Sequence, residues 1–448
     1  MTNSSHHMLV AALYRLLVFG EPVPSARTDA LLVGCRILLR SNAMIDVPPY
    51  IARHIILSSY SEVDEVLRSH AFGQGLRVKA DPFARDTLLL LDDEAHFERR
   101  RIESPLFSRD ALKSYENNAL RPVIRDSLQL LAGGRDAAGH VTTDVVRLVR
   151  SLLYRVSAAV TGIDGVDTPE RGERFSWFID RLGEGFNVEW STSDHDDVVR
   201  EMLRIRADFV EEFFQPSVDR RVRLIEQHHA SGGTTPLPKD LITLLYNHRR
   251  EDWDDTLPLR EATLFLVASA GTSTNGTVNT VWHLLRWLEG HPEDRERLPD
   301  LTFIRAATWE SLRLHTPSPA LLRRALMDVT LKSGRHVKKD EQVALLFSAA
   351  NQDPDAFGPN ADGFNPHRQL SGMVKPWGLS FGGGEHTCIG RSLAMGISNE
   401  DGAHGTMVEI VSAFFQAAPE LLADHPAVRN GASYHDAFSL LPVRFTNI

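Results

Sequence analysis

The chain has 448 residues, of which 42% are hydrophobic and 24% are charged, and its formal net charge is −10. This composition is that of a globular protein, and its interspersed charges exclude the basic face that nucleic-acid binding requires. The two cysteines, Cys35 and Cys388, exclude a disulfide framework and favour a reducing compartment.

The N-terminal segment contains an apolar run from Met8 to Phe19. The run is too short for a helix that spans a membrane, and Arg15 interrupts it. It also lacks the basic flank and the cleavage site of a signal peptide. We therefore expect an amphipathic first helix, no membrane attachment and a cytoplasmic location.

Helical periodicity dominates the rest of the chain. Apolar residues recur at helical spacing, opposite charged faces, in four segments: 61–69, 93–107, 141–161 and 198–229. The longest pattern, 259–288, follows Pro258 and stops at Gly290-His291-Pro292. Its middle is apolar or small, so we expect a helix that is buried on most sides.

Strand-like runs are short, and they fall at 55–57, 328–331 and 342–347. No linker, internal repeat or low-complexity segment divides the sequence. We therefore predict a mainly α fold with a small β region, in a single compact domain over residues 1–448.

A glycine-rich loop surrounds the second cysteine, with the sequence Phe381-Gly-Gly-Gly-Glu-His-Thr-Cys388-Ile-Gly390. Such a loop lets backbone N–H groups approach a thiolate and spread its charge. A helix that starts at about Gly390 adds a favourable dipole for the anion. One alternative is a buried free cysteine beside a glycine-rich turn. A second is a phosphate-binding loop, against which no Lys-Ser/Thr follows the glycines.

This segment resembles the cytochrome P450 signature in Phe381, Gly384, Cys388 and Gly390. The resemblance implies a soluble, bacterial-type haem-thiolate monooxygenase with the P450 fold. It also implies haem b as cofactor, Cys388 as the iron ligand, and Phe381 and Gly390 beside the cofactor. The resemblance covers roughly residues 50–395 and only weakly residues 1–45.

Three further residues match a structural network of the family. Glu310 and Arg313 form its Glu-x-x-Arg motif, three residues apart on one helix face. Downstream, Arg368 matches the third partner. The resemblance implies a buried network that braces the loop leading to Cys388, whereas an isolated pair of this kind is usually on the surface.

Basic residues match the family's contacts to the haem propionates. These residues are His96, Arg100, Arg323 and His386. Each alone is more often a surface charge, and the joint order along the chain is what supports the assignment.

The long helix contains Ala270-Gly271-Thr272-Ser273-Thr274, which resembles the family pattern Ala/Gly-Gly-x-Asp/Glu-Thr. By this resemblance, Gly271 opens a groove for dioxygen and Thr274 helps to deliver protons to it, while Ser273 replaces the usual acid. Protons then pass through Ser273, Thr274 and water, or the substrate supplies part of the path, or proton delivery is weak. Back-bonding of either hydroxyl to the helix is the structural alternative.

The resemblance implies insertion of one oxygen atom from O₂ into a small or medium-sized organic substrate, as in many bacterial relatives of secondary metabolism. Electrons are expected from a separate ferredoxin- or flavodoxin-type partner, and a carrier protein is a candidate for presenting the substrate. The alternatives are a peroxygenase, isomerase, dehydratase or group-transfer enzyme of the same fold, or a non-catalytic haem-binding member. After the cysteine loop, the polar stretch 398–405 predicts an interruption of the following helix.

Overall fold

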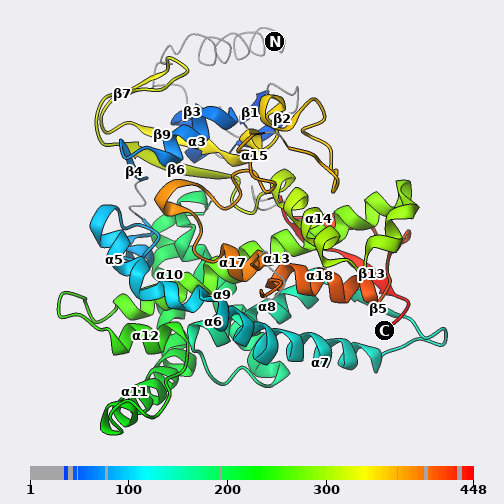
Figure 1. Ribbon diagram of the computed structural model, residues 1–448. Helices are drawn as coiled ribbons and strands as arrows, with labels where there is room; N and C mark the ends of the chain where they lie inside the picture. The colour runs from blue at the N-terminus through cyan, green and yellow to red at the C-terminus, as the bar shows by residue number, and fades with distance from the viewer. Residues whose placement is uncertain are drawn as a thin grey trace.

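The computed structural model describes residues 35–38, 44–47, 49–75, 79–191, 193–370, 372–397, 402–430 and 436–448. The expected first helix at Met8–Phe19 lies outside these residues. Within these ranges, no helix is at once long enough and apolar enough to cross a membrane. The described chain forms a mainly helical body with a smaller β region, as its periodicity predicts (Figure 1).

The longer helices are α3 (Tyr60–Arg68), α5 (Asp93–Glu103), α6 (Arg109–Tyr115), α7 (Arg121–Ala132), α8 (Val145–Thr161), α9 (Pro169–Phe186), α10 (His195–Phe209), α11 (Gln215–Ala230), α12 (Leu241–Asn247), α13 (Leu257–Gly290), α14 (Leu301–Leu314) and α18 (Thr406–Gln416). Short helices are α2 (Pro49–Ala52), α4 (Asp81–Ala84), α15 (Phe347–Ala350), α16 (Pro354–Phe357) and α17 (Arg391–Met395).

The longest helix, α13, crosses the middle of the molecule and packs against α8, α9, α14 and α18 (Figure 1). Pro258 lies in its first turn, where the missing N–H of proline breaks no helical hydrogen bond. Leu266, Val278 and Leu284 are among its buried side chains. The expected burial of this helix on most sides is confirmed.

The main sheet has the strand order β3-β9-β6-β4, in which β3 and β9 are parallel and the other pairs are antiparallel. Its strands are β3 (Ile55–Leu57), β9 (Gln342–Leu346), β6 (Ala320–Ala325) and β4 (Phe72–Gln74). A second sheet joins β10 (Pro419–Leu421), β13 (Pro442–Phe445) and β5 (Val141–Asp144). Antiparallel pairs are formed by β1 (Cys35–Leu38) with β2 (Met44–Val47), β7 (Val329–Thr330) with β8 (His336–Val337), and β11 (Val428–Arg429) with β12 (Phe438–Leu440).

The periodic segment 141–161 divides at Asp144, and the prediction of one helix over its whole length is wrong. Residues Val141–Asp144 form β5 because β13 offers them backbone partners. The Asp144 carboxylate then accepts a hydrogen bond from the N–H of Val146 at 3.0 Å, which caps α8. A polar N-cap residue thus marks the true start of the helix.

The helix after the cysteine loop is interrupted, as predicted. It ends at Met395, and α18 begins at Thr406. The chain leaves the helical path at Gly396 and returns at Gly405, where a Cβ on either glycine would overlap the backbone of the other end. The N–H of Ile397 donates to the carbonyl oxygen of Ala403 at 2.9 Å, which closes the base of the excursion.

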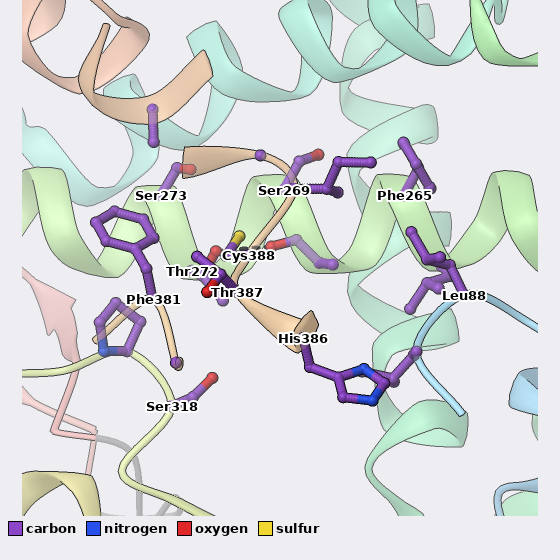
Figure 2. Close-up of a pocket in the computed structure, with 18 of the residues that line it drawn as sticks. Leu88, Phe265, Ser269, Thr272, Ser273, Ser318, Phe381, His386, Thr387 and Cys388 are labelled. Atoms are coloured by element: carbon purple, nitrogen blue, oxygen red, sulfur yellow. Dashed lines mark hydrogen bonds between the residues drawn. The ribbon is translucent and has the colours of Figure 1, made fainter. Parts of the chain in front are cut away.

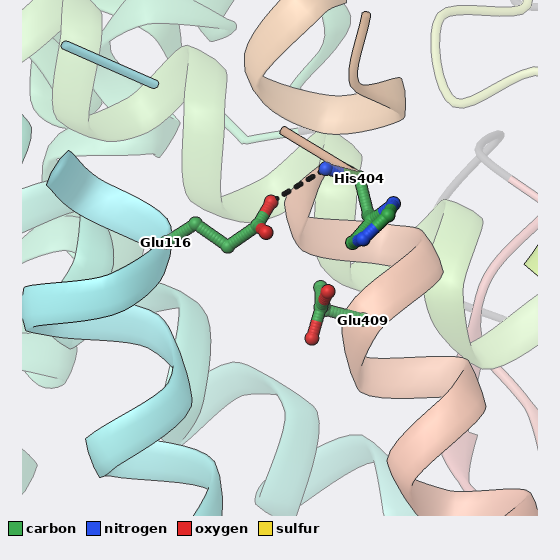
Figure 3. Close-up of side chains that lie close together, drawn as sticks. All are labelled: Glu116, His404 and Glu409. Carbon is green, nitrogen blue, oxygen red and sulfur yellow. Dashed lines mark hydrogen bonds between the residues drawn. The ribbon is translucent and has the colours of Figure 1, made fainter. Parts of the chain in front are cut away.

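A charged cluster holds this base against the π turn η3 (Glu116–Leu120) (Figure 3). Glu116 accepts hydrogen bonds from the backbone N–H groups of His404 and Gly405 at 2.7 and 3.2 Å. Arg121 donates to Glu116 at 2.8 Å and to Glu409 at 2.9 Å. Although ligand atoms of Glu116, His404 and Glu409 lie within 4.8 Å of one another, Arg121 already supplies positive charge to both carboxylates. The cluster therefore has a structural role: it holds η3 against the start of α18.

Candidate active site

The loop that carries Cys388 is closed by its own backbone. The N–H of Cys388 donates to the carbonyl oxygen of Phe381 at 2.9 Å, across the 3₁₀ turn η7 (Gly384–His386). Gly384 has a φ of +65°, and a Cβ there would overlap the carbonyl oxygen of Leu67 in α3. Only glycine combines this backbone conformation with so close an approach.

The thiol of Cys388 opens into a cavity of about 360 Å³, a volume within the range of ligand and cofactor sites. Figure 2 shows Cys388 on its loop in front of α13, the helix that carries Thr272. Burial raises the pKa of the Cys388 thiol, against the opposing effects of the Gly390 and Arg391 N–H groups and the Arg100 charge. A metal ion at the sulfur would reverse this balance and hold the thiolate.

The four basic residues expected at the propionates all line this cavity: His96, Arg100, Arg323 and His386. Arg100 donates to the carbonyl oxygen of Thr387 at 2.7 Å, which ties α5 to the cysteine loop. Gln74 links two of the others, because it lies 2.7 Å from an Arg323 nitrogen and 2.9 Å from His386 Nδ1. The structure thus brings together groups that are far apart in sequence.

His96, in this basic cluster, has a ring nitrogen that is unpaired within the described chain and a lowered pKa. Its Nδ1 atom is buried and has no hydrogen-bond partner among the described residues. Burial, with added repulsion from His386 and Arg100, lowers the pKa of His96 to about 4. An acidic group bound beside the imidazole ring would oppose these effects and favour protonation of His96.

The residues therefore fit a flat, apolar cofactor that carries a metal and acidic substituents, as haem does. The cavity offers a sulfur ligand, basic groups at one edge and mostly apolar walls. Phe381 and Gly390 also line it, as expected. Cys388 would hold the iron, and the basic cluster would pair with the propionates.

The structure changes the assignment on α13. Thr272 and Ser273 line the cavity, whereas Thr274 and Gly271 do not. Two residues along a helix correspond to a rotation of about 200°, so Thr272 and Thr274 face nearly opposite ways. The Thr274 hydroxyl is buried and has no hydrogen-bond partner within the described chain. The expected catalytic placement of Thr274 and Gly271 is therefore corrected.

A shift of the motif by two residues accounts for this geometry. In Ala268-Ser269-Ala270-Gly271-Thr272, Thr272 then stands at the threonine position, while Ser269 and Gly271 stand where the family pattern has glycine and the acid. Ala268 and Ser269 line the cavity with Thr272, as one helical face requires. Thr272 Oγ1 donates to the carbonyl oxygen of Ala268 at 2.6 Å. In either register, no acid stands in the motif.

The network of Glu310, Arg313 and Arg368 is formed as expected. Arg313 donates to both Glu310 oxygens at 2.8 and 2.7 Å, and Arg368 donates to Glu310 at 2.9 Å. Arg313 is fully buried and also donates to the carbonyl oxygens of Asn351 and Ala361. The network thus joins α14 to the irregular segment that leads to Cys388, and it lies outside the cavity.

A second buried charged cluster was not expected from the sequence. Glu103 in α5 and Glu261 in α13 are both 0% exposed, and Arg99 donates to Glu261 at 2.5 Å. Both Glu103 oxygens lack a hydrogen-bond partner in the described part of the chain. Burial raises the pKa of Glu261 to about 7 and the pKa of Glu103 well above its usual value. Arg99 thus pairs directly with Glu261, while Glu103 is buried without a hydrogen-bond partner among the described residues.

Comparison with known proteins agrees with this site. The chain matches the family model of cytochrome P450 over residues 52–398, and it belongs to the cytochrome P450 family. A cyclooctat-9-en-7-ol 5-monooxygenase of Streptomyces melanosporofaciens is 26% identical over 349 residues, or 72% of each chain. A biotin biosynthesis cytochrome P450 of Bacillus subtilis is 38% identical over 167 residues, which are 35% of this chain and 37% of that protein.

Solved structures share the fold over nearly the whole chain. P450BioI in complex with a hexadec-9Z-enoic acid ligated acyl carrier protein has a TM-score of 0.65 at 21% identity, covering 87% of this chain and 92% of that one. CalO2 has a TM-score of 0.66 at 20% identity, covering 100% and 98%. At such identities the likeness shows the fold alone. Family membership and the relatives' names together support an oxygenating oxidoreductase with a haem cofactor.

Proposed function

We propose that the protein is a monooxygenase that uses haem b to insert one oxygen atom from O₂ into a small or medium-sized, mainly apolar substrate. One observation carries the proposal: Cys388 of the cysteine loop and Thr272 of α13 line the same cavity (Figure 2). When bound, haem would supply the iron chemistry that activates dioxygen. The protein would hold the iron through Cys388 and the propionates through the basic cluster.

The proton path runs through hydroxyl groups. Between Glu261 and Glu289, α13 contains no acidic residue, so a carboxylate of this helix cannot serve the cavity at its midpoint. Thr272 Oγ1 would hold a proton at the cavity wall and pass it inward, with Ser273 beside it. Water would connect these hydroxyls to solvent.

The electron donor in this proposal is a separate ferredoxin- or flavodoxin-type protein. A substrate presented by a carrier protein is also proposed, because P450BioI is solved with an acyl carrier protein that bears its ligand. The apolar walls, with Leu88, Leu89, Leu90 and Phe265 among them, suit a substrate with extended hydrocarbon surface.

A second candidate is an enzyme of the same fold that does not use the usual proton relay, such as a peroxygenase, isomerase, dehydratase or group-transfer enzyme. The observation that favours it is the absence of an acid in the Ala268–Asn275 segment of α13. Turnover with NAD(P)H and surrogate redox partners, compared with turnover with hydrogen peroxide, separates the two candidates.

The first test is the reduced carbon monoxide difference spectrum of the purified protein and of Cys388→Ala. A Soret band at the position typical of thiolate ligation, lost in the variant, supports the proposal. A protein that takes up no haem, or a band that the substitution leaves unchanged, contradicts it.

A further inference from the structure

The cavity contains a charged group that the chemistry around Cys388 does not use. Glu189 lies in the 3₁₀ turn η4 (Val188–Trp190), directly after α9, and is 8% exposed. The other charged side chains among the described lining residues are the basic ones assigned to the cofactor. Among the described lining residues, Glu189 is therefore the acidic one, and it lies on an element that is remote in sequence from the cysteine loop.

The hydrogen bonds of Glu189 leave half of its carboxylate available. Oε1 accepts from the backbone N–H groups of Lys79 and Ala80, both at 3.0 Å. Oε2 accepts no hydrogen bond from any residue that the structure describes. The ammonium of Lys79 is engaged elsewhere, because it pairs with Asp196 at 2.5 Å. No cation in the described chain is thus paired with Glu189.

Anchoring the loop does not require a negative charge. A neutral glutamine carbonyl could accept the same two N–H groups, so the anchor alone does not account for a carboxylate. A carboxylate on a largely apolar wall is costly to bury without a partner. A positively charged ligand group would form a charge-assisted hydrogen bond or ion pair there, stronger than a neutral contact.

We propose that Glu189 binds the positively charged nitrogen of an apolar, amine-bearing substrate and so selects cations over carboxylic acids in this cavity. The inference rests on the proposed function, since it assigns a substrate class to the same cavity. The hydrocarbon part of such a ligand would lie along the apolar wall that includes Leu88 and Leu90. A free fatty acid would instead place its carboxylate beside that of Glu189, and the two negative charges would repel each other.

The test uses the haem-loaded protein and three probes that each have a ten-carbon chain: decyltrimethylammonium, 1-decanol and decanoate. The quaternary nitrogen cannot ligate iron, so a shift of the Soret band reports occupation of the cavity. Each Kd is measured from that shift and by calorimetry. We expect the cation to bind roughly 10-fold more tightly than the anion in the wild type, the ratio that one charged hydrogen bond supports.

Glu189→Gln keeps an acceptor for Lys79 and Ala80 and removes the charge, so the cation-to-anion preference should fall to within about 3-fold. The matched control is Asp196→Asn, which removes the ion pair of Lys79 at a residue outside the cavity lining. This variant should keep the wild-type preference for the cation over the anion. Equal preference in the wild type and Glu189→Gln, or an equal loss in Asp196→Asn, overturns the inference.

The outcomes also separate this inference from the proposed function. A protein with no thiolate-type carbon monoxide spectrum fails the proposed function, whereas a normal spectrum without cation preference fails the inference alone. Should Glu189→Gln not take up haem, the wild type still decides, because a cation-to-anion ratio near one overturns the role of Glu189.

Discussion

Gly384 lies so close to the Leu67 carbonyl oxygen that no side chain fits between the cysteine loop and α3. The position of the Cys388 sulfur is therefore set by a backbone-to-backbone contact between segments more than three hundred residues apart in sequence. The first prediction follows from this contact.

We expect Gly384→Ala to reduce haem uptake and to lower Tm, because alanine meets both a positive φ and the Leu67 oxygen. Gly382→Ala is the matched control, since Gly382 has a φ of +67° but its Cβ would lie 3.6 Å from the nearest heavy atom outside its chain neighbours. The control should cost about 1–2 kcal/mol and Gly384→Ala more. The ratio of Soret to 280 nm absorbance and thermal unfolding measure the two effects; equal effects would contradict the steric argument.

Thr272→Ala and Thr274→Ala distinguish the two registers of the α13 motif. Thr272 lines the cavity and Thr274 does not, so only Thr272→Ala should disturb proton delivery. We expect it to lower the fraction of NAD(P)H that ends in product by about 10-fold or more. Thr274→Ala should stay within about twofold of the wild type. The reverse order would restore the original assignment of Thr274.

Arg368→Ala should destabilise the fold by about 3–5 kcal/mol, because it leaves buried Glu310 short of one of its two arginine partners. The measurement is the free energy of unfolding in urea. Arg125→Ala removes an exposed arginine that pairs with Asp126, and its effect should stay within about 0.5 kcal/mol. A similar small effect for Arg368→Ala would mean that the network contributes little stability.

The contribution of Glu103 and Glu261 to the stability of the protein should fall as the pH rises from 4.5 through about 7. Glu261 has a pKa raised by burial from 4.5 to about 7, and that of Glu103 is raised well above 4.5. Over this range the unfolded chain releases protons that the folded state still holds, so deprotonation favours unfolding. Glu103→Gln should flatten this dependence in a series of Tm values against pH. An unchanged slope would show that Glu103 does not titrate in this way.

Much of the fold was predictable, because long helices such as α13 and α8 carry strong amphipathic or apolar patterns. The Glu310–Arg313–Arg368 network and the cavity position of Cys388 also agreed with prediction, since both stand in motifs with a recognisable spacing. The division at Asp144 was not predictable from periodicity, because β13, its partner, lies almost three hundred residues downstream.

The errors at the site have a physical cause. The α13 motif can be aligned in two registers, and a pattern of small residues does not show which helix face meets the cavity. The structure resolves this through the common face of Ala268, Ser269 and Thr272. Gln74 and Glu189 were missed because each acts through contacts that the fold creates, and neither stands in a motif that sequence reasoning could detect.

Gly396 and Gly405 meet at the base of the excursion that follows the cysteine loop. Because the excursion starts and ends at nearly one point, its length is independent of the spacing between Cys388 and α18. Residues can be gained or lost there without a shift in the iron ligand, since loop closure depends only weakly on length. Insertions or deletions between Ile397 and Ala403 should therefore leave the position of the Cys388 sulfur unchanged.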